Sequence, residues 1–229
     1  MPERSSRSSH DAFHADTDGT DPARSAAAFY TLVDRVVDDP EASALLHARF
    51  DRTVATLVVD YTAMVKRTDA HGIAYALGLA RAATRVMMPT LEARGAVTVK
   101  TVADTVFCIF ESPHEALLGA LDARAALQTF NVGRTGCLAH RERNDAIHPC
   151  MGLGHGPTLV VPKVDLFGAE TNRAFVLGED VAEANEILLS ENFLAAVSPL
   201  PSGVGAFHAP ADRVAEAGFP FHVLADYRD

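Results

Sequence analysis

Two aspartates, Asp60 and Asp104, are the residues of this sequence whose types and surroundings most clearly suggest chemistry. Asp60 ends the apolar, β-branched run at 53–60, and Asp104 lies just after the run at 97–102. Two carboxylates a few ångströms apart repel each other unless one is protonated or a cation lies between them. Carboxylate oxygens are ligands that suit Mg²⁺ and Mn²⁺. The pair is therefore a candidate divalent-metal site, provided that the fold brings the two side chains together.

The expected elements bring both aspartates to one edge of a sheet. The runs at 53–60, 97–102 and 106–110 predict strands, and apolar residues at helical spacing predict a long helix from Asp69 to Arg94. A strand and the strand that follows its crossover helix run parallel, so their carboxyl ends share an edge. Asp is also common in turns, which explains either residue alone. The joint placement favours a metal site.

Lys100 lies four residues before Asp104 and therefore on the same face of its strand. A lysine that points inward from an apolar strand needs a polar partner. The alternative is an edge lysine whose ammonium reaches the solvent. The pattern leaves both interpretations open.

The remaining pattern predicts an α+β fold. Ser112 to Glu115 is a capping box that begins a helix. Further elements are expected as strands at 150–153 and 158–161 around a turn at 154–156, a helix from about 168, a strand at 187–189, a helix at 191–197, and strands at 204–208 and 219–224. The order is that of a ferredoxin-like βαββαβ core with extra C-terminal strands and helices.

Three regions are expected along the chain. Residues 1–25 are polar and predict a disordered tail. Residues 26–52 predict an N-terminal helical segment of two short amphipathic helices, interrupted at Pro40. The main domain takes 53–229, because a chain of 229 residues has room for one good-sized domain with an appendage.

Composition and charge argue against several classes of protein. The chain has 20 Lys+Arg and 30 Asp+Glu, and its net charge of −10 opposes a nucleic-acid partner, which needs clustered basic residues. No apolar stretch approaches the roughly 18 residues of a membrane span, and the polar start does not resemble a secretory signal. The three cysteines lack the spacing of a disulfide framework or a zinc knuckle. We therefore expect a cytoplasmic protein.

Four segments agree in order and interval with the motifs of one known family. LVVDYTAMVKR at 57–67 is similar to a first metal-binding segment, and GAVTVKTVADTVFCIFESP at 95–113 to a Lys-Thr-Ile-Gly-Asp hairpin. MGLGHGPTLVV at 151–161 is similar to a glycine-rich strand and turn, and VDLFGAETNRAFVLGEDVAEANEILLS at 164–190 to an Asp-x-x-Gly-x-x-x-Asn region with its following helix. On these segments the sequence resembles the catalytic domain of class III nucleotidyl cyclases, the adenylate and guanylate cyclases.

The resemblance implies an enzyme that converts a nucleoside triphosphate into a 3′,5′-cyclic nucleotide and pyrophosphate, with 53–229 as its catalytic domain. It implies that Asp60, Asp104 and the main-chain carbonyl of Tyr61 hold two divalent cations, Mg²⁺ or Mn²⁺. Such cations activate the ribose 3′-hydroxyl and bind the triphosphate. It also implies a head-to-tail homodimer with two sites between the subunits.

The same resemblance implies which residues contact the base and the ribose. Lys100 and Asp165 would recognise the base from the partner subunit, and this pair is the adenine-type combination, so ATP is the favoured substrate. Asn172 would orient the ribose. CTP or UTP is an alternative substrate, because Ala-Met-Val at 63–65 replaces the usual Gly-Phe-Thr.

Other residues depart from the family pattern. Val176 stands where the family places an arginine that neutralises the transition state, and Arg173 is turned about 100° away around the helix. This departure favours an alternative function, a cyclase-like regulatory or dimerisation module with weakened catalysis. A palm-like polymerase shares the topology but needs a basic groove that this acidic chain lacks. Tyr61 is also explained as an aromatic residue packed under a helix.

Overall fold

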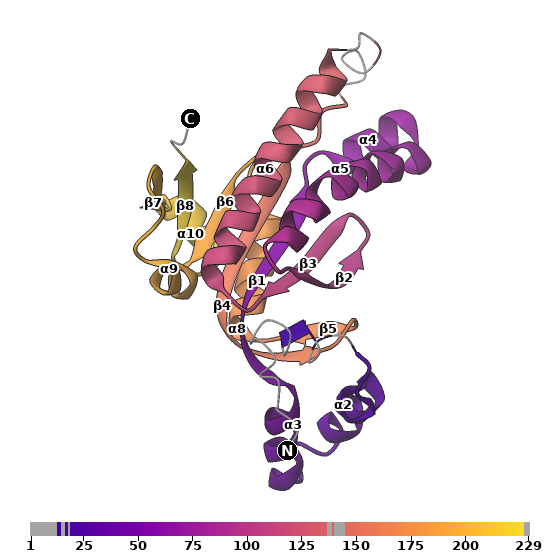
Figure 1. The fold of residues 1–229 in the computed structure, drawn as a ribbon, viewed down its shortest axis with the longest axis vertical. Coiled ribbons are helices and arrows are strands. Elements are labelled where there is room, and N and C mark those ends of the chain that lie inside the picture. Colours follow the sequence, from indigo (N-terminus) through magenta and orange to yellow (C-terminus); the bar gives the residue numbers. More distant parts are fainter. Residues whose placement is uncertain (1–12, 15–16, 18, 137–138, 140–144, 227–229) are drawn as a thin grey trace, which may run out of the picture.

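The computed structural model describes residues 13–14, 17, 19–136, 139 and 145–226 (Figure 1). Most of the predicted tail lies outside this part of the chain, so its disorder stays a prediction, as do the boundaries at 25 and 52. The described end of that segment contains the short 3-10 helix η1 (Pro22–Arg24).

The two short N-terminal helices are α2 (Ala26–Val33) and α3 (Pro40–Phe50), as the sequence predicts. Pro40 is the first residue of α3, and Asp39 caps the helix by accepting hydrogen bonds from two backbone N–H groups. Both helices lie below the body of the sheet in Figure 1. Phe29 and Phe50 pack there against Val161 at the end of strand β4 (Pro149–Val161).

The core of the main domain has the predicted order of elements. β1 (Asp51–Tyr61) leads through α4 (Met64–His71) and α5 (Ile73–Ala93) to the hairpin of β2 (Val97–Val102) and β3 (Thr105–Phe110), and α6 (Pro113–Thr135) leads on to β4. These strands lie in the order β2-β3-β1-β4, and each neighbouring pair is antiparallel. β2 therefore runs parallel to β1, and the ferredoxin-like prediction is confirmed.

The long helix predicted from Asp69 to Arg94 is divided in two. α4 ends at His71 and α5 begins at Ile73, and Asp69 lies inside α4 instead of capping a helix. Gly72, between the helices, has a φ of +84°. This positive value breaks the helix and favours glycine.

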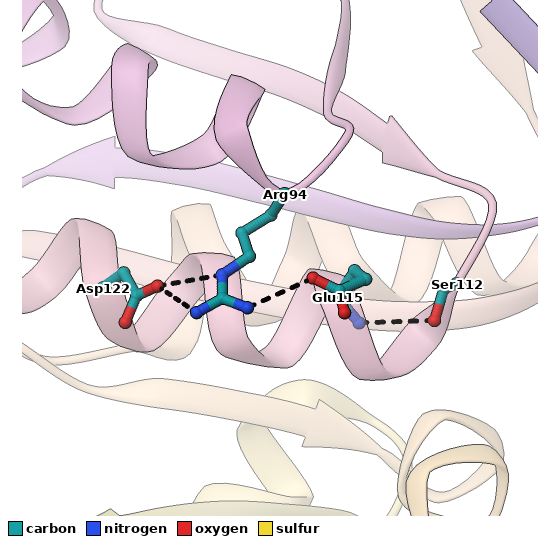
Figure 2. A network of polar contacts seen from close by, with 4 residues as sticks. All are labelled: Arg94, Ser112, Glu115 and Asp122. Atoms are coloured by element: carbon teal, nitrogen blue, oxygen red, sulfur yellow. Dashed lines mark hydrogen bonds and ion pairs between the residues drawn. The ribbon is translucent and has the colours of Figure 1, made fainter. Parts of the chain in front are cut away.

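Helices α5 and α6 cover one face of the sheet. Side chains from both helices and from alternate residues of the central strands form a large apolar cluster, which includes Leu57, Met87, Leu117, Met151 and Leu189. Figure 2 shows a polar contact that joins the two helices at the surface: Arg94, directly after α5, donates hydrogen bonds to Asp122 at 2.9 and 3.0 Å and to Glu115 at 3.4 Å. Ser112 caps α6 through the Glu115 N–H, as predicted.

Helix α8 (Ala169–Val176) covers the opposite face and packs directly on β4. The turn predicted at 154–156 is wrong, because β4 is one continuous strand from Pro149 to Val161. Its glycines allow the helix to approach: a Cβ on Gly152 would overlap the carbonyl oxygen of Ala174, and one on Gly154 would overlap the carbonyl oxygen of Glu170. These glycines are therefore needed for helix packing, not for a turn.

The predicted C-terminal strands and helices extend the sheet beyond β4. β5 (Asp165–Phe167) pairs with one end of β4, and a π-helix, η2 (Leu177–Val181), continues α8. β6 (Ile187–Ser190) pairs with β4 in parallel, followed in space by β8 (Phe221–Asp226) and β7 (Val204–His208). Helices α9 (Glu191–Val197) and α10 (Ala211–Ala217) complete this region. No helix in the described part of the chain is long and apolar enough to cross a membrane.

The close approach of α8 to β4 leads to a first prediction. Gly154→Ala should lower the free energy of unfolding by about 3 kcal/mol, because the new methyl group forces the α8 backbone away from the strand. Gly78→Ala is the matched control, since Gly78 lies exposed in α5 with nothing within 4 Å of an added Cβ. It should raise the free energy of unfolding by about 0.5–1 kcal/mol. Denaturant titration measures the free energy of unfolding of both variants. Equal effects of the two substitutions would contradict the role of Gly154 in the packing of α8 on β4.

Candidate functional site

Asp60 and Asp104 reach the same cavity from two neighbouring parts of the sheet. Asp60 is the last residue but one of β1, and Asp104 lies in the turn between β2 and β3, directly after Ala103 with its φ of +53°. The register of β1 and β3 sets Val59 opposite Val106, so β3 begins beside Asp60. Both carboxylates line an open cavity of about 500 Å³. The structure thus brings the two predicted ligands together.

Asp60 belongs to the face of the sheet that carries α8. Val58, two residues earlier in β1, packs against Phe107 of β3 and Ala174 of α8, and residues two apart in a strand share a face. The pKa of Asp60 is raised from 3.8 to about 7, chiefly by burial and to a smaller extent by the charges of Glu179 and Asp104. The environment therefore disfavours an isolated negative charge on Asp60 at neutral pH.

Glu179 is a third carboxylate of this cavity, and sequence reasoning missed it. The Thr105 hydroxyl donates a hydrogen bond to Glu179 and lies 3.4 Å from Asp60 Oδ1. Glu179 belongs to the π-helix η2, whose wider turn breaks the 3.6-residue period that places side chains on a helix face. The sequence signal that could have indicated it is its acidic type next to Gly178, which packs against the main chain of Val58.

Tyr61 packs its side chain on the other face of the sheet. The ring is buried, and the hydroxyl lies 3.1 Å from Thr84 Oγ1 of α5. Burial raises the pKa of the Tyr61 phenol to about 12. The interpretation of Tyr61 as an aromatic residue under a helix therefore holds for its side chain, and only its main chain is left for a role as a ligand.

Lys100 and Asp165 form an ion pair in which Nζ and Oδ1 are 2.6 Å apart. About a quarter of each side chain is exposed, at 26% and 28%. Asp165 Oδ1 also accepts a hydrogen bond from the Leu166 N–H at 2.7 Å, and Lys100 Nζ lies 4.7 Å from the centroid of the Phe107 ring. Lys100 thus has the polar partner that an inward lysine requires, and a residue 65 positions away supplies it.

Asn172, Arg173 and Val176 lie on α8. Asn172 is exposed. Val176 packs against the apolar cluster around Leu177 and Phe221. Arg173 donates a hydrogen bond to Glu170, and its guanidinium carbon lies 5.7 Å from the centroid of the Phe219 ring. Arg173 is therefore engaged with its own neighbours and does not replace the arginine expected at position 176.

Comparison with solved structures identifies the fold. The adenylyl cyclase CyaB from P. aeruginosa superimposes with a TM-score of 0.60 at 16% identity, covering 78% of this chain and 96% of that one. An adenylate/guanylate cyclase/hydrolase from Silicibacter pomeroyi gives 0.63 at 21% identity, covering 78% and 98%. The guanylate cyclase domain of RhGC from Catenaria anguillulae, in complex with GTP, gives 0.62 at 14% identity, covering 78% and 99%.

The chain has the nucleotidyl cyclase fold. No protein-family model and no curated protein matches the sequence. The resemblance predicted from four sequence segments is confirmed at the level of the fold. At identities of 14–21%, this similarity is evidence for the fold alone.

The carboxylate cavity of the cyclase fold suits a hard divalent cation. Its acidic groups offer oxygen ligands, and burial together with the charges of Glu179 and Asp104 raises the pKa of Asp60, so a cation there would offset an unfavourable negative charge. Among the described residues, no group of three or more His, Cys, Asp or Glu side chains is arranged to hold one ion. A site with two carboxylates fits Mg²⁺, which is usually bound by one or two carboxylates, waters and substrate phosphates.

The raised pKa of Asp60 makes a second prediction. The pKa in the folded protein is about 7 and the ordinary value is 3.8, so the stability of the metal-free protein falls as the pH rises between these values. At pH 8, Asp60→Asn should therefore raise the melting temperature by about 2–4 °C, which corresponds to about 1 kcal/mol after allowance for solvent screening. At pH 4 the gain should vanish.

Mn²⁺ gives this prediction a second readout. At pH 8, Mn²⁺ should stabilise the wild-type protein and have little effect on the Asp60→Asn variant, because the ion requires the carboxylate. Asp38→Asn, at an exposed position between α2 and α3, is the control and should behave as wild type at both pH values. A pH-independent effect of Asp60→Asn would contradict the account.

Proposed function

We propose that this chain is a nucleotidyl cyclase that converts a nucleoside triphosphate, with ATP favoured, into a 3′,5′-cyclic nucleotide and pyrophosphate. The observation that carries the proposal is that Asp60 and Asp104 line one open cavity of a cyclase fold. The alternative of a palm-like polymerase is disfavoured by the net charge of −10, which does not suit a template strand.

Asp60 and Asp104, with the main-chain carbonyl of Tyr61, would hold two divalent cations, Mg²⁺ or Mn²⁺. Bound cations would lower the pKa of the ribose 3′-hydroxyl and offset charge on the triphosphate. The 3′-oxygen attacks the α-phosphorus in line, and pyrophosphate leaves. Asn172, exposed on α8, would orient the ribose for this attack.

Lys100 and Asp165 would select the base. Adenine presents a ring nitrogen that accepts a hydrogen bond beside an amino group that donates one, so a lysine and a carboxylate complement its edge. The 2.6 Å contact between the two side chains supports a preformed pair, because the donor and the acceptor are already adjacent. CTP or UTP remains the alternative substrate, since residues 63–65 depart from the family pattern.

A head-to-tail homodimer would complete each site with Lys100 and Asp165 of the partner subunit. Exposed apolar side chains around Asp104 support a partner at this surface, because isolated subunits rarely expose such patches. They are Val65, Ile73, Leu77 and Val102, with exposed fractions of 76, 68, 48 and 53%. A cytoplasmic location stays a prediction from the sequence.

An assay of turnover tests the proposal directly. Purified protein is incubated with ATP, GTP, CTP or UTP and Mn²⁺ or Mg²⁺, and cyclic nucleotide and pyrophosphate are quantified. We expect equal amounts of both products, with ATP preferred. Asp60→Ala should lower the rate by about 10²-fold or more, whereas Asp38→Ala should leave it unchanged. Absence of cyclic product from all four nucleotides would overturn the proposal.

The environment of Val176 favours a second candidate function, a regulatory or dimerisation module with weakened catalysis. Its side chain lies in an apolar cluster, and Arg173 is engaged with Glu170. An arginine at position 176 can pack its stem on that cluster and extend its charged end outward, because Val176 is only partly buried.

Val176→Arg therefore separates the two functions. If the chain is a cyclase that lacks only a cation at position 176, the substitution should raise kcat, by up to about 10²-fold. Val176→Leu is the control for a change of side-chain size and should leave kcat near the wild-type value. Rapid turnover by the wild-type protein would exclude the regulatory module. No gain from Val176→Arg over Val176→Leu would contradict the missing-cation interpretation.

A further inference from the structure

Phe175 is an exposed aromatic residue of α8. Its side chain is 39% exposed. It lies one helical turn after Asn172 and next to Ala174, which is buried against the sheet. Its ring stacks on that of Phe107, with centroids 5.9 Å apart and planes 11° from parallel. Phe107 is only 4% exposed, so the ring of Phe175 packs on a buried ring.

Phe107 also supports the Lys100–Asp165 ion pair. Lys100 is directly opposite Phe107 in the register of β2 and β3, and Lys100 Nζ lies 4.7 Å from the centroid of the Phe107 ring. One buried ring thus carries the exposed ring of Phe175 and the ammonium of Lys100, which holds Asp165 at 2.6 Å. Phe175 and Lys100 thus contact the same ring, on the face of the sheet that carries α8.

This combination is what a planar heterocycle with a polar edge requires. A base gains most when its face stacks on an aromatic ring and its edge meets hydrogen-bonding groups in the same place. Exposure of a large apolar ring without a ligand or partner is unfavourable, and a rigid ring loses little conformational entropy on binding.

We propose that Phe175, supported by Phe107, is the stacking surface for the nucleotide base whose polar edge is recognised by Lys100 and Asp165. The inference rests on the proposed function and makes it more specific. Phe175 is a binding residue that favours purine triphosphates, because the larger purine ring covers more of the aromatic face than a pyrimidine does.

The chain offers a matched control in Phe167. This residue is 37% exposed and stacks on the buried Phe29, with centroids 5.3 Å apart and planes 10° from parallel. Its surroundings differ, because its ring stacks on Phe29 of α2 and belongs to the apolar surface formed with that helix. Phe167→Ala removes the same group from the same kind of stack.

The test is binding of 3′-deoxy-ATP, which lacks the attacking hydroxyl, and of inorganic tripolyphosphate, which lacks a base. Affinities are measured by calorimetry with Mn²⁺ for the wild-type protein and for Phe175→Ala, Phe175→Leu, Phe175→Tyr and Phe167→Ala. Loss of a base-stacking ring lowers affinity by about 5- to 150-fold. We expect a loss in this range of 3′-deoxy-ATP affinity for Phe175→Ala, a smaller loss for Phe175→Leu, and no loss for Phe175→Tyr or Phe167→Ala. Tripolyphosphate affinity should not change.

Several results would overturn the inference. These are unchanged 3′-deoxy-ATP affinity in Phe175→Ala, an equal loss of tripolyphosphate affinity, or an equal loss in Phe167→Ala. Phe175→Leu keeps an apolar side chain on Phe107 and decides the matter if Phe175→Ala does not fold. A change in sedimentation without a change in nucleotide affinity would assign Phe175 to a subunit contact instead.

The inference and the proposed function fail in distinguishable ways. If the wild-type protein cyclises ATP but Phe175→Ala binds 3′-deoxy-ATP normally, only the role of Phe175 is wrong. If the wild-type protein binds no nucleoside triphosphate, both are wrong.

Discussion

The unfavourable burial of negative charge at the end of β1, beside two further carboxylates, is the interaction on which the site depends. Asp60, Asp104 and Glu179 line one cavity, and burial of Asp60 makes its negative charge more unfavourable than it would be in water. A folded protein can relieve such a charge by protonation or with a cation. Asp60 can be protonated near neutral pH, because its pKa is about 7. The alternative is a hard divalent cation, which could also take part in catalysis. The roles proposed for the other site residues follow from the second choice.

The rest of the domain holds these groups in place. The antiparallel register of β1 and β3 sets the β2–β3 turn beside the end of β1, which fixes Asp104 relative to Asp60. On the α8 face, the glycines of β4 let the helix backbone lie directly on the strand, so Asn172 and Phe175 are carried at a fixed height above the sheet. On the other face, Arg94 ties the end of α5 to α6 (Figure 2). The site is thus built on rigid elements, which suits a reaction that depends on positioned charges.

Much of the fold could be predicted from the sequence, because its signals are local. The apolar runs at 97–102 and 106–110 predicted the two strands of the hairpin, and the capping box at Ser112 predicted the start of α6. The prediction of a turn at 154–156 was wrong, because a glycine that allows a helix to approach a strand looks the same in the sequence as a glycine in a turn. The break at Gly72 was missed because the apolar pattern continues across it. For the site, topology predicted the approach of Asp60 and Asp104, whereas Glu179 depends on a π-helix that no helical period reveals.

The most direct test is the anomalous scattering of Mn²⁺ in crystals grown with Mn²⁺ and 3′-deoxy-ATP, whose missing hydroxyl prevents turnover. The account predicts anomalous density between the carboxylates of Asp60 and Asp104, with the triphosphate bound beside it. Carboxylates that diverge, with manganese density elsewhere or absent, would contradict the central claim.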